Sequence, residues 1–172
     1  MDSLDRDVLL ALQADGRKSN LALAHSLGLS PSAMLGRVRR LERSGAISGY
    51  RAIIDPAALG ITVRAFVVVR LREHSEQSIR EFEERIKHVV GVRACYHVTG
   101  RFDMLLELAL RDLDHLSRLT RVDIARIPGV MNLETMLIMA ESVTDEGWPA
   151  DPEPHVATAA VAGPGAYPPK EE

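Results

Sequence analysis

The chain has 172 residues, of which 46% are hydrophobic, so it can bury one medium core or two small ones, and this composition excludes a disordered protein. Its single cysteine, Cys95, excludes an intramolecular disulfide framework and a cysteine-rich zinc site; we expect it to be a buried strand residue. No apolar run approaches the roughly 20 residues that cross a bilayer, and the start MDSLDRD does not resemble a signal peptide. We therefore expect a cytoplasmic protein.

The formal net charge of −3 is distributed unevenly along the chain. Residues 1–60 carry eight basic and six acidic residues, residues 61–143 carry twelve of each, and residues 144–172 carry one lysine and six acids. Between Arg17 and Arg51, seven basic residues stand against Glu42 alone. A patch of one sign attracts a polyanion, so this region is the candidate nucleic-acid-binding part of an acidic protein.

The first 45 residues predict three short helices joined by tight turns. Leu4, Val8 and Leu12 form one apolar helical stripe, which Asp2 or Ser3 can cap. A second helix is expected from about residue 19 to 28, and the pair Ser30-Pro31 favours the start of a third. This arrangement is typical of a helix-turn-helix unit.

The third helix is expected to be apolar on one side and basic on the other, because successive residues rotate by about 100°. Met34, Val38 and Leu41 fall on the apolar side. Gly36 is costly in mid-helix, by about 1 kcal/mol relative to alanine. It is either a tolerated weak position or a place where the backbone approaches a ligand surface.

After residue 45 the pattern changes to alternating strands and helices. Residues 46–55 predict a strand or short hairpin, and residues 61–143 predict the order β-α-β-β-α-β, which is the split βαβ or ferredoxin-like arrangement. The elements expected there are strands at 61–73, 92–98, 104–110 and 130–142, a helix at 75–89 and a helix capped by Asp112, with Leu113, Leu116, Leu119 and Ile127 facing inward.

Residues 144–172 are rich in proline, alanine and acids, and we expect them to be disordered. Trp148 either packs the start of this segment onto the second domain or is exposed. The chain thus divides into a DNA-binding domain at 1–50, a linking strand or hinge at 51–60, a second domain at 61–143 and a tail at 144–172.

Short sequence motifs, occurring in the same order along the chain, resemble those of the Lrp/AsnC family of prokaryotic feast/famine regulators over residues 3 to about 143. In the first domain they are Leu4-Asp5-x-Asp7, Asp15-Gly16-Arg17, Leu23-Ala24, Gly28-Leu29-Ser30-Pro31, Val38-Arg39-Arg40-Leu41-Glu42, Gly45-x-Ile47-x-Gly49-Tyr50, Asp55-Pro56 and Leu59-Gly60. In the second they are Val98-x-Gly100-x-Phe102-Asp103 and Ile127-Pro128-Gly129-Val130.

The resemblance implies an α+β protein with a winged helix-turn-helix domain and a ferredoxin-like domain that binds an effector and mediates oligomerisation. It implies a homodimer that assembles into a tetramer or octamer, with double-stranded DNA and a small amino-acid-like effector as partners. We expect no cofactor and, because no second His, Cys or carboxylate stands at ligand spacing from His97, no metal. The third helix would be the recognition helix in the major groove. Its candidate DNA-binding residues are Ser30, Ser32, Ala33, Gly36, Arg37, Arg39, Arg40 and Arg43. Family members often carry arginine near Gly36, so base preference there can differ.

The turn at residues 99–103 matches the family's ligand loop. The candidate effector-binding residues are Thr99, Gly100, Arg101, Phe102, Asp103 and, on the last strand, Thr135. Gly100 leaves backbone amides free to meet a carboxylate, and Asp103 could receive an ammonium group. An acidic residue is usual at Arg101, where a guanidinium favours a carboxylate. An ordinary hairpin turn with solvent-facing charges is the alternative interpretation.

Two other functions fit parts of the pattern. A siroheme-decarboxylase-like enzyme is similar in architecture, but it would need histidines gathered in a cleft, whereas here they are scattered, so we expect no enzyme. An architectural DNA-compacting protein would share the basic helix, and only comparison of specific with scrambled DNA separates it from a regulator.

Overall fold

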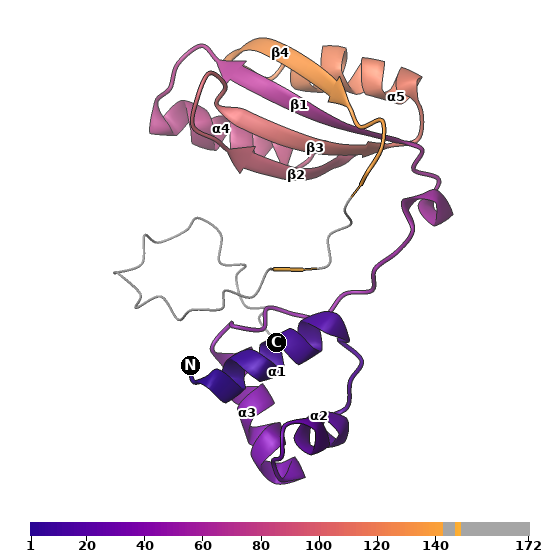
Figure 1. The fold of residues 1–172 in the computed structure, drawn as a ribbon. Coiled ribbons are helices and arrows are strands. Elements are labelled where there is room, and N and C mark those ends of the chain that lie inside the picture. Colours follow the sequence, from indigo (N-terminus) through magenta and orange to yellow (C-terminus); the bar gives the residue numbers. More distant parts are fainter. Residues whose placement is uncertain (143–146, 149–172) are drawn as a thin grey trace. The chain divides into compact units, whose positions relative to one another are not determined.

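The computed structural model describes residues 1–142 and 147–148, and these residues form two compact units (Figure 1). One unit contains residues 1–51 together with Gly147 and Trp148. The other begins at Ala52 and contains a four-stranded sheet. The predictions for the remaining tail residues lie outside the described part of the chain.

The three helices expected near the N-terminus are present, and polar side chains cap each of them. Helix α1 spans Ser3–Ala14, α2 spans Asn20–Ser26 and α3 spans Pro31–Arg43. Asp2 caps α1 in a capping box with Asp5, while Ser19 and Ser30 cap the other two helices. The prediction of a helix-turn-helix unit is therefore confirmed.

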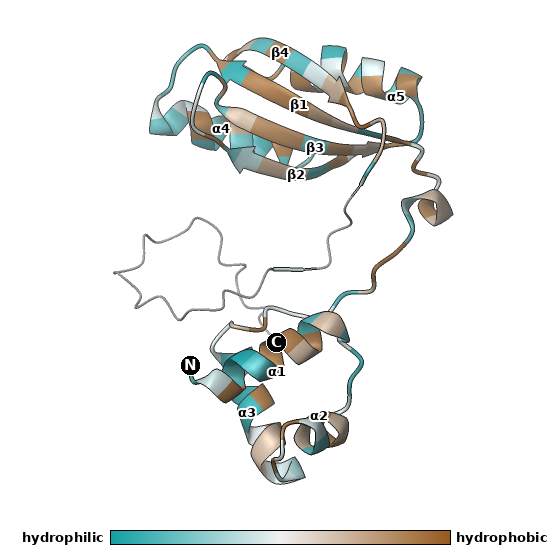
Figure 2. Ribbon diagram, viewed as in Figure 1, coloured by the Kyte–Doolittle hydropathy of each residue, from teal (hydrophilic) through white to brown (hydrophobic). Residues whose placement is uncertain are grey.

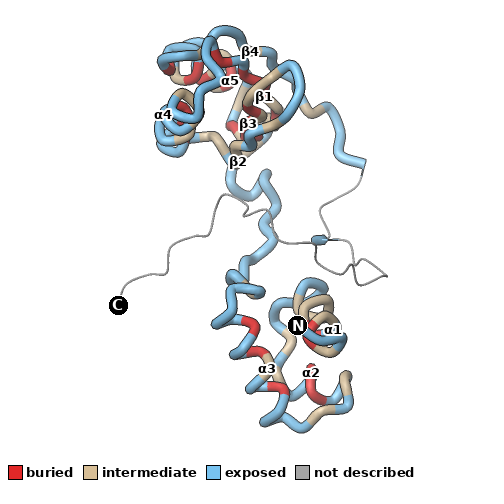
Figure 3. Tube along the Cα trace, turned by 90° about the vertical axis from the view of Figure 1, so that its left-hand side faces the viewer, coloured by how far each residue is buried: buried red, intermediate tan, exposed pale blue. Residues whose placement is uncertain are grey.

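The apolar sides of these helices meet in one small core. All of its fully buried members come from the three helices: Val8, Leu23, Ala24, Met34, Val38 and Leu41. Figure 3 shows these buried positions on the inner sides of the helices. Packing of α3 through Met34, Val38 and Leu41 leaves its other side exposed to solvent, which is the arrangement a recognition helix needs.

The segment between α3 and the sheet corrects one expectation, because residues 46–55 form no strand within the described part of the chain. A 3-10 helix, η1 at Pro56–Leu59, follows instead and is capped by Asp55. The alternation in this segment is real, but a strand needs a neighbouring strand to bond its backbone. With no neighbouring strand in the described chain, the side chain of Ile53 is 98% exposed.

The second unit has the predicted β-α-β-β-α-β order, with a fully antiparallel sheet in the strand order β2-β3-β1-β4. Its elements are β1 Val63–Leu71, α4 Glu76–Ile86, β2 Val92–His97, β3 Met104–Leu110, α5 Leu113–Arg118 and β4 Val130–Leu137. A turn of π-helix, η2 at Leu119–Ile124, continues α5. This is the ferredoxin-like fold, as Figure 1 shows.

The two helices cover one face of the sheet (Figures 1 and 3). Alternate residues of β1 and β3, such as Val67 and Leu106, are fully buried against Phe82 of α4 and Leu119 of η2. The central strands are accordingly the most hydrophobic of the sheet (Figure 2). Leu113, expected to face inward, is 58% exposed because it lies in the first turn of α5, ahead of the part that packs on the sheet.

The opposite face of the sheet has no helix over it in the described chain. It carries Phe66 and Val68 of β1, in register with Met136 and Glu134 of β4. Met136 is 48% exposed, whereas Val68 is only 8% exposed. Large apolar side chains on an uncovered face indicate a surface that another molecule can cover.

One acidic residue lies buried in the middle of this uncovered face. Glu107 of β3 is 6% exposed and accepts hydrogen bonds from Arg64 and Arg93. Arg64 also donates to Glu141 at 2.7 Å. The carboxylate is therefore paired from both sides, which is the condition for holding a charge away from water.

Cys95 lies in β2, as the sequence predicts, but it is half-buried at the edge of the core rather than fully buried. Burial and the nearby Glu83 raise the pKa of its thiol to about 11. A thiol with such a pKa is almost wholly protonated at neutral pH, so Cys95 has the properties of a structural residue rather than of a nucleophile.

Candidate DNA-binding surface and effector site

The exposed side of α3 carries most of the residues predicted to contact DNA. Seven of the eight are exposed, namely Ser30, Ser32, Ala33, Gly36, Arg39, Arg40 and Arg43. The hydroxyl of Ser30 accepts from the backbone N–H of Ala33 and lies 3.2 Å from the hydroxyl of Ser32. The N-terminal end of α3 is thus small, polar and open, while its C-terminal half is cationic.

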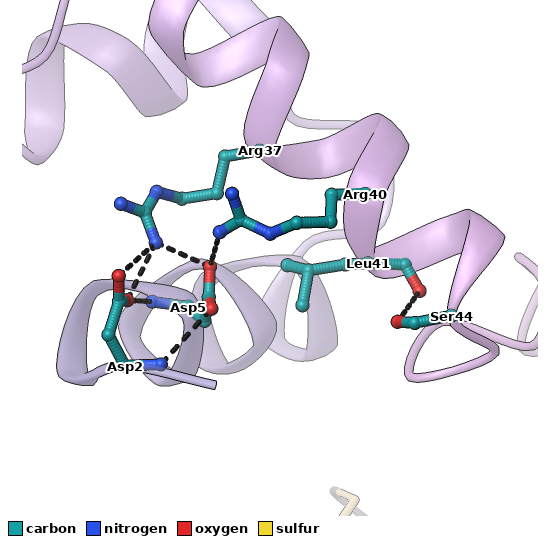
Figure 4. Close-up of polar contacts among 6 residues, drawn as sticks. All are labelled: Asp2, Asp5, Arg37, Arg40, Leu41 and Ser44. Carbon is teal, nitrogen blue, oxygen red and sulfur yellow. Dashed lines mark hydrogen bonds and ion pairs between the residues drawn. The ribbon is translucent and has the colours of Figure 1, made fainter.

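Arg37 is the exception, because its guanidinium is held against α1. Its Nη1 donates to Oδ1 of Asp2 at 2.6 Å and also to the carboxylate of Asp5 (Figure 4). The side chain of Arg37 is only 17% exposed. Its main contacts are therefore within the domain, and any role in DNA binding would require these bonds to be shared or broken.

Asp5 is the centre of this cluster. Its side chain is 4% exposed, and Arg40 donates from Nη2 to the same Asp5 oxygen at 2.8 Å (Figure 4). Arg40 itself remains 55% exposed. Asp5 therefore connects the first helix to the third, a role beyond the favourable interaction that any acid makes with a helix N-terminus.

The protonation of the two acids reflects these contacts. Burial raises the pKa of Asp5, but the backbone N–H of Asp2 and the guanidinium groups of Arg37 and Arg40 outweigh it and lower the pKa to about 2. The Arg37 side chain also lowers the pKa of Asp2. Asp2 raises the pKa of Arg37, with Asp5 as a second contributor. Both carboxylates are therefore ionised at neutral pH and partly neutralise α3 on this side.

Arg39 and Arg43 are the cations of α3 that remain fully available. Both are exposed, and among the described residues neither side chain forms an ion pair. A long hydrogen bond joins the two residues: Nε of Arg43 donates to the backbone carbonyl oxygen of Arg39 at 3.4 Å. Two guanidinium groups one turn apart on an open helix face suit binding to phosphates or guanine edges.

Gly36 lies in the middle of this exposed side. Apart from its chain neighbours and the backbone of its own helix, a Cβ at this position would meet no atom of the described residues within 4 Å. Packing inside the protein therefore does not require glycine here, although glycine weakens the helix. Gly36 is therefore either a tolerated weak position or a place where the helix backbone approaches a molecule outside the chain.

The predicted effector loop forms the turn between β2 and β3. Gly100 has φ +124°, a conformation that side-chain-bearing residues rarely adopt. Asp103, at the end of the turn, has both carboxylate oxygens engaged. Oδ2 accepts from the backbone N–H of Leu71 at 2.7 Å, and Oδ1 lies 2.6 Å from Nδ1 of His74. A ligand ammonium group at Asp103 would have to join these contacts.

Arg101 brings the loop close to the last strand. Its guanidinium lies over the ring of Phe102, 4.6 Å from the centroid, and 3.5 Å from the carboxylate of Glu134. Thr135 follows Glu134 but pairs in register with buried Val67, so it lies on the helix-covered side of the edge strand. The loop therefore approaches Glu134, which the sequence did not indicate, more directly than Thr135.

A separate hollow of about 580 Å³ lies at the other end of β3. It is lined by Ile61, Gly91 and Arg111, among others, and includes no residue of the predicted loop. Within this single chain, residues 99–103 line an open surface rather than this hollow.

In the described residues no cluster of histidine, cysteine and carboxylate side chains could hold a metal ion. None of the described helices is long and apolar enough to cross a membrane.

Comparisons with known proteins match both units. A winged helix-turn-helix DNA-binding domain family matches residues 1–48, and the Lrp/AsnC ligand binding domain matches residues 64–148. The leucine-responsive regulatory protein of Escherichia coli strain K12 is 36% identical over 141 residues, covering 82% of this chain and 86% of that protein. This chain belongs to the Lrp/AsnC family.

Solved structures of other family members have the same fold. An AsnC family regulator from Agrobacterium tumefaciens aligns with a TM-score of 0.80 and 28% identity, covering 87% of this chain and 97% of that chain. A transcriptional regulator from Neisseria meningitidis, solved as a complex with L-Met, aligns with a TM-score of 0.78 and 26% identity, covering 84% and 93%. The present Lrp/AsnC member is thus a DNA-binding transcriptional regulator with a ligand-binding domain.

Proposed function

We propose that this Lrp/AsnC regulator binds specific DNA sites through the exposed side of α3 and changes its DNA affinity or assembly when a small amino-acid-like ligand binds at residues 99–103. The observation that carries the first half is the pair Arg39 and Arg43 on an open helix whose other side is fixed in the core. Short residues at the start of α3 would permit close approach to base edges, while the arginines would bind phosphates or guanine.

The ligand class follows from the loop and from the relatives. The E. coli relative is named for its response to leucine, and the Neisseria structure contains L-Met. In this chain Arg101 is 78% exposed and can bind a carboxylate, at the cost of its long contact with Glu134. We therefore propose an amino acid or related metabolite, with preference for one that carries an additional carboxylate.

The assembly follows from the uncovered face of the sheet. Phe66, Val68 and Met136 lie on this face with no helix over them in the described chain. A second copy would bury these side chains, so we propose a homodimer that pairs through this face and assembles into a tetramer or octamer. Met136→Arg should shift the mass measured by light scattering toward the monomer, because it places a charge in the buried contact.

One experiment tests the functional proposal as a whole. Genome-wide mapping of DNA bound by the tagged chain should give discrete sites, and an operator taken from one of them should bind more tightly than a scrambled duplex at matched salt. Adding each amino acid in turn should change that affinity or the oligomer mass. Equal affinity for operator and scrambled DNA would instead favour an architectural DNA-compacting protein.

A further inference from the structure

We propose that Asp2 holds Arg37 back from DNA and so lowers the affinity of the regulator for DNA phosphates. The proposal rests on the proposed DNA-binding side of α3 and adds an internal restraint to it. Asp2 is then a positioning residue, because it acts on DNA binding through Arg37 and makes no contact with DNA of its own.

Arg37 uses only one of its three side-chain nitrogens inside the domain. All of its hydrogen bonds come from Nη1, two to the carboxylate of Asp2 at 2.6 and 2.8 Å and one to Asp5 (Figure 4). Nε and Nη2 have no partner among the described residues, where no buried side-chain nitrogen lacks one, so both atoms reach solvent. A guanidinium binds phosphate through two parallel N–H groups. Arg37 thus keeps the donors for one phosphate contact.

Arg37 also lies at the border of the side of α3 that is proposed to face DNA. It follows Gly36, where an added Cβ would lie in open space beyond its own helix. Arg40, about one turn later, binds the same Asp5 oxygen as Arg37 and is nevertheless 55% exposed. Side chains that reach Asp5 from α3 therefore remain close to the open side of the helix.

Of the two acids that bind Arg37, Asp2 is the one that a phosphate would meet. The side chain of Asp2 is 55% exposed, whereas that of Asp5 is 4% exposed. Asp2 is held in place as the N-cap of α1, where Oδ1 accepts from the backbone N–H of Asp5 at 2.7 Å. A phosphate that approaches Arg37 would therefore be repelled by an ionised carboxylate already bound to the same guanidinium.

Asp2→Asn removes this charge and leaves the surrounding structure in place. Asparagine caps a helix about as well as aspartate, and Asp5 still connects Arg37 and Arg40 to α1. Asp7→Asn is the matched control, because it removes one exposed acid from the same helix. Asp7 lies about 200° around α1 from Asp5, and its side chain forms no ion pair among the described residues.

The test measures binding of the full chain to a random-sequence duplex, because the electrostatic part of binding does not depend on sequence. Asp2→Asn should bind about threefold more tightly than Asp7→Asn at roughly 50 mM salt, as expected for release of a partly exposed ion pair. Its slope of log affinity against log salt should be steeper by up to about 0.9, because Arg37 gains one phosphate. Equal affinity and slope for the two variants, or tighter binding by Asp7→Asn, would overturn the proposal.

A second pair of variants tests whether Arg37 carries the effect. Both changes are repeated in an Arg37→Gln background, in which no guanidinium remains to be released. Asp2→Asn should then have no advantage over Asp7→Asn, whereas an undiminished advantage would show that Asp2 acts without Arg37 and would also overturn the proposal. Titration in the cold, with helix content followed by circular dichroism, allows for the lower stability expected without Arg37. If that background does not fold, the first pair alone decides.

The outcome is separable from that of the functional proposal. If wild type binds DNA and distinguishes operator from scrambled sequence while Asp2→Asn and Asp7→Asn behave alike, the restraint alone is wrong. If wild type fails to distinguish the two duplexes but Asp2→Asn still binds more tightly than Asp7→Asn, the specific regulatory function is wrong and the restraint is supported. Absence of DNA binding by all three proteins would overturn both.

Discussion

Arg37 of α3 donates to the carboxylate of Asp5 in the first turn of α1, and Arg40 binds the same oxygen at 2.8 Å. Two arginines of the recognition helix are thereby paired with an acid that is 32 and 35 residues away in the sequence. The cluster fixes the orientation of α3 against α1. Arg39 and Arg43 are the exposed arginines of α3 whose side chains form no ion pair among the described residues, so they are available to bind DNA.

Asp5→Asn should lower the stability of the DNA-binding domain at neutral pH, because Arg37 and Arg40 lose the charge that binds them. The pKa of Asp5 lies at about 2 in the folded chain, below the ordinary value of 3.8. A lowered pKa contributes stability above the ordinary value, and this contribution is lost as pH falls from about 4 to about 2.

Calorimetry of the full chain should therefore show a melting temperature several degrees lower for Asp5→Asn at pH 7, with the two proteins converging near pH 2. Asp7→Asn, which changes an exposed acid of the same helix, is the matched control. An Asp5 variant as stable as the Asp7 variant at pH 7 would show that the cluster does not hold α1 to α3.

Arg39→Ala should weaken DNA binding without affecting folding, because the side chain is exposed and unpaired among the described residues. The slope of log affinity against log salt should fall by about 0.9 if one phosphate contact is lost. Arg37→Ala should behave differently and lower the melting temperature. Unchanged DNA affinity for Arg39→Ala and for Arg43→Ala would remove α3 as the DNA-binding element.

Gly36→Ala should stabilise α3 by up to about 1 kcal/mol, because a helical glycine is replaced and the new Cβ would meet no described residue outside the helix backbone within 4 Å. If the backbone approaches DNA at this point, the same change should reduce operator affinity. Thermal melting and DNA titration of one preparation measure both effects. A stabilised variant that binds DNA as well as wild type would mean that Gly36 is only a tolerated weak position.

Arg101→Glu should reverse the charge preference of the effector loop. A charge-assisted contact is worth about 1.5–3 kcal/mol, so an acidic amino acid that uses Arg101 should bind more weakly by about tenfold or more. Calorimetric titration of the full chain with aspartate, glutamate and leucine measures this. Arg72→Glu, an exposed arginine outside the loop, is the control. Equal effects of the two variants would place the ligand elsewhere.

Local patterns in the sequence predicted most of the fold. Ser30 and Pro31 determine the start of α3 because one supplies the capping oxygen and the other the backbone angle. The apolar run at residues 104–110 indicates β3, and its Leu106 and Leu108 are buried in the core. Each of these signals acts over a few residues, and a single sequence contains all the information needed to read it.

Contacts between distant residues could not be predicted in this way. No spacing rule links Asp5 to Arg37, or Gln13 to Trp148, because helix packing and the return of the chain bring them together. Residues 46–55 show the opposite failure, since their alternation suggested a strand for which the described chain provides no neighbour. At the candidate effector site, Glu134 and His74 were missed because they become neighbours of the loop only in the folded sheet.

The raised pKa of Cys95 has a practical consequence for labelling. The only native thiol of the chain is almost wholly protonated near pH 7 and partly covered, so it should react slowly with a maleimide dye. A second cysteine introduced at exposed Ser32 should then accept a fluorophore nearly alone. The wild-type framework is thus suited to recording the arrival of DNA at α3 in real time, with no need to remove a native cysteine first.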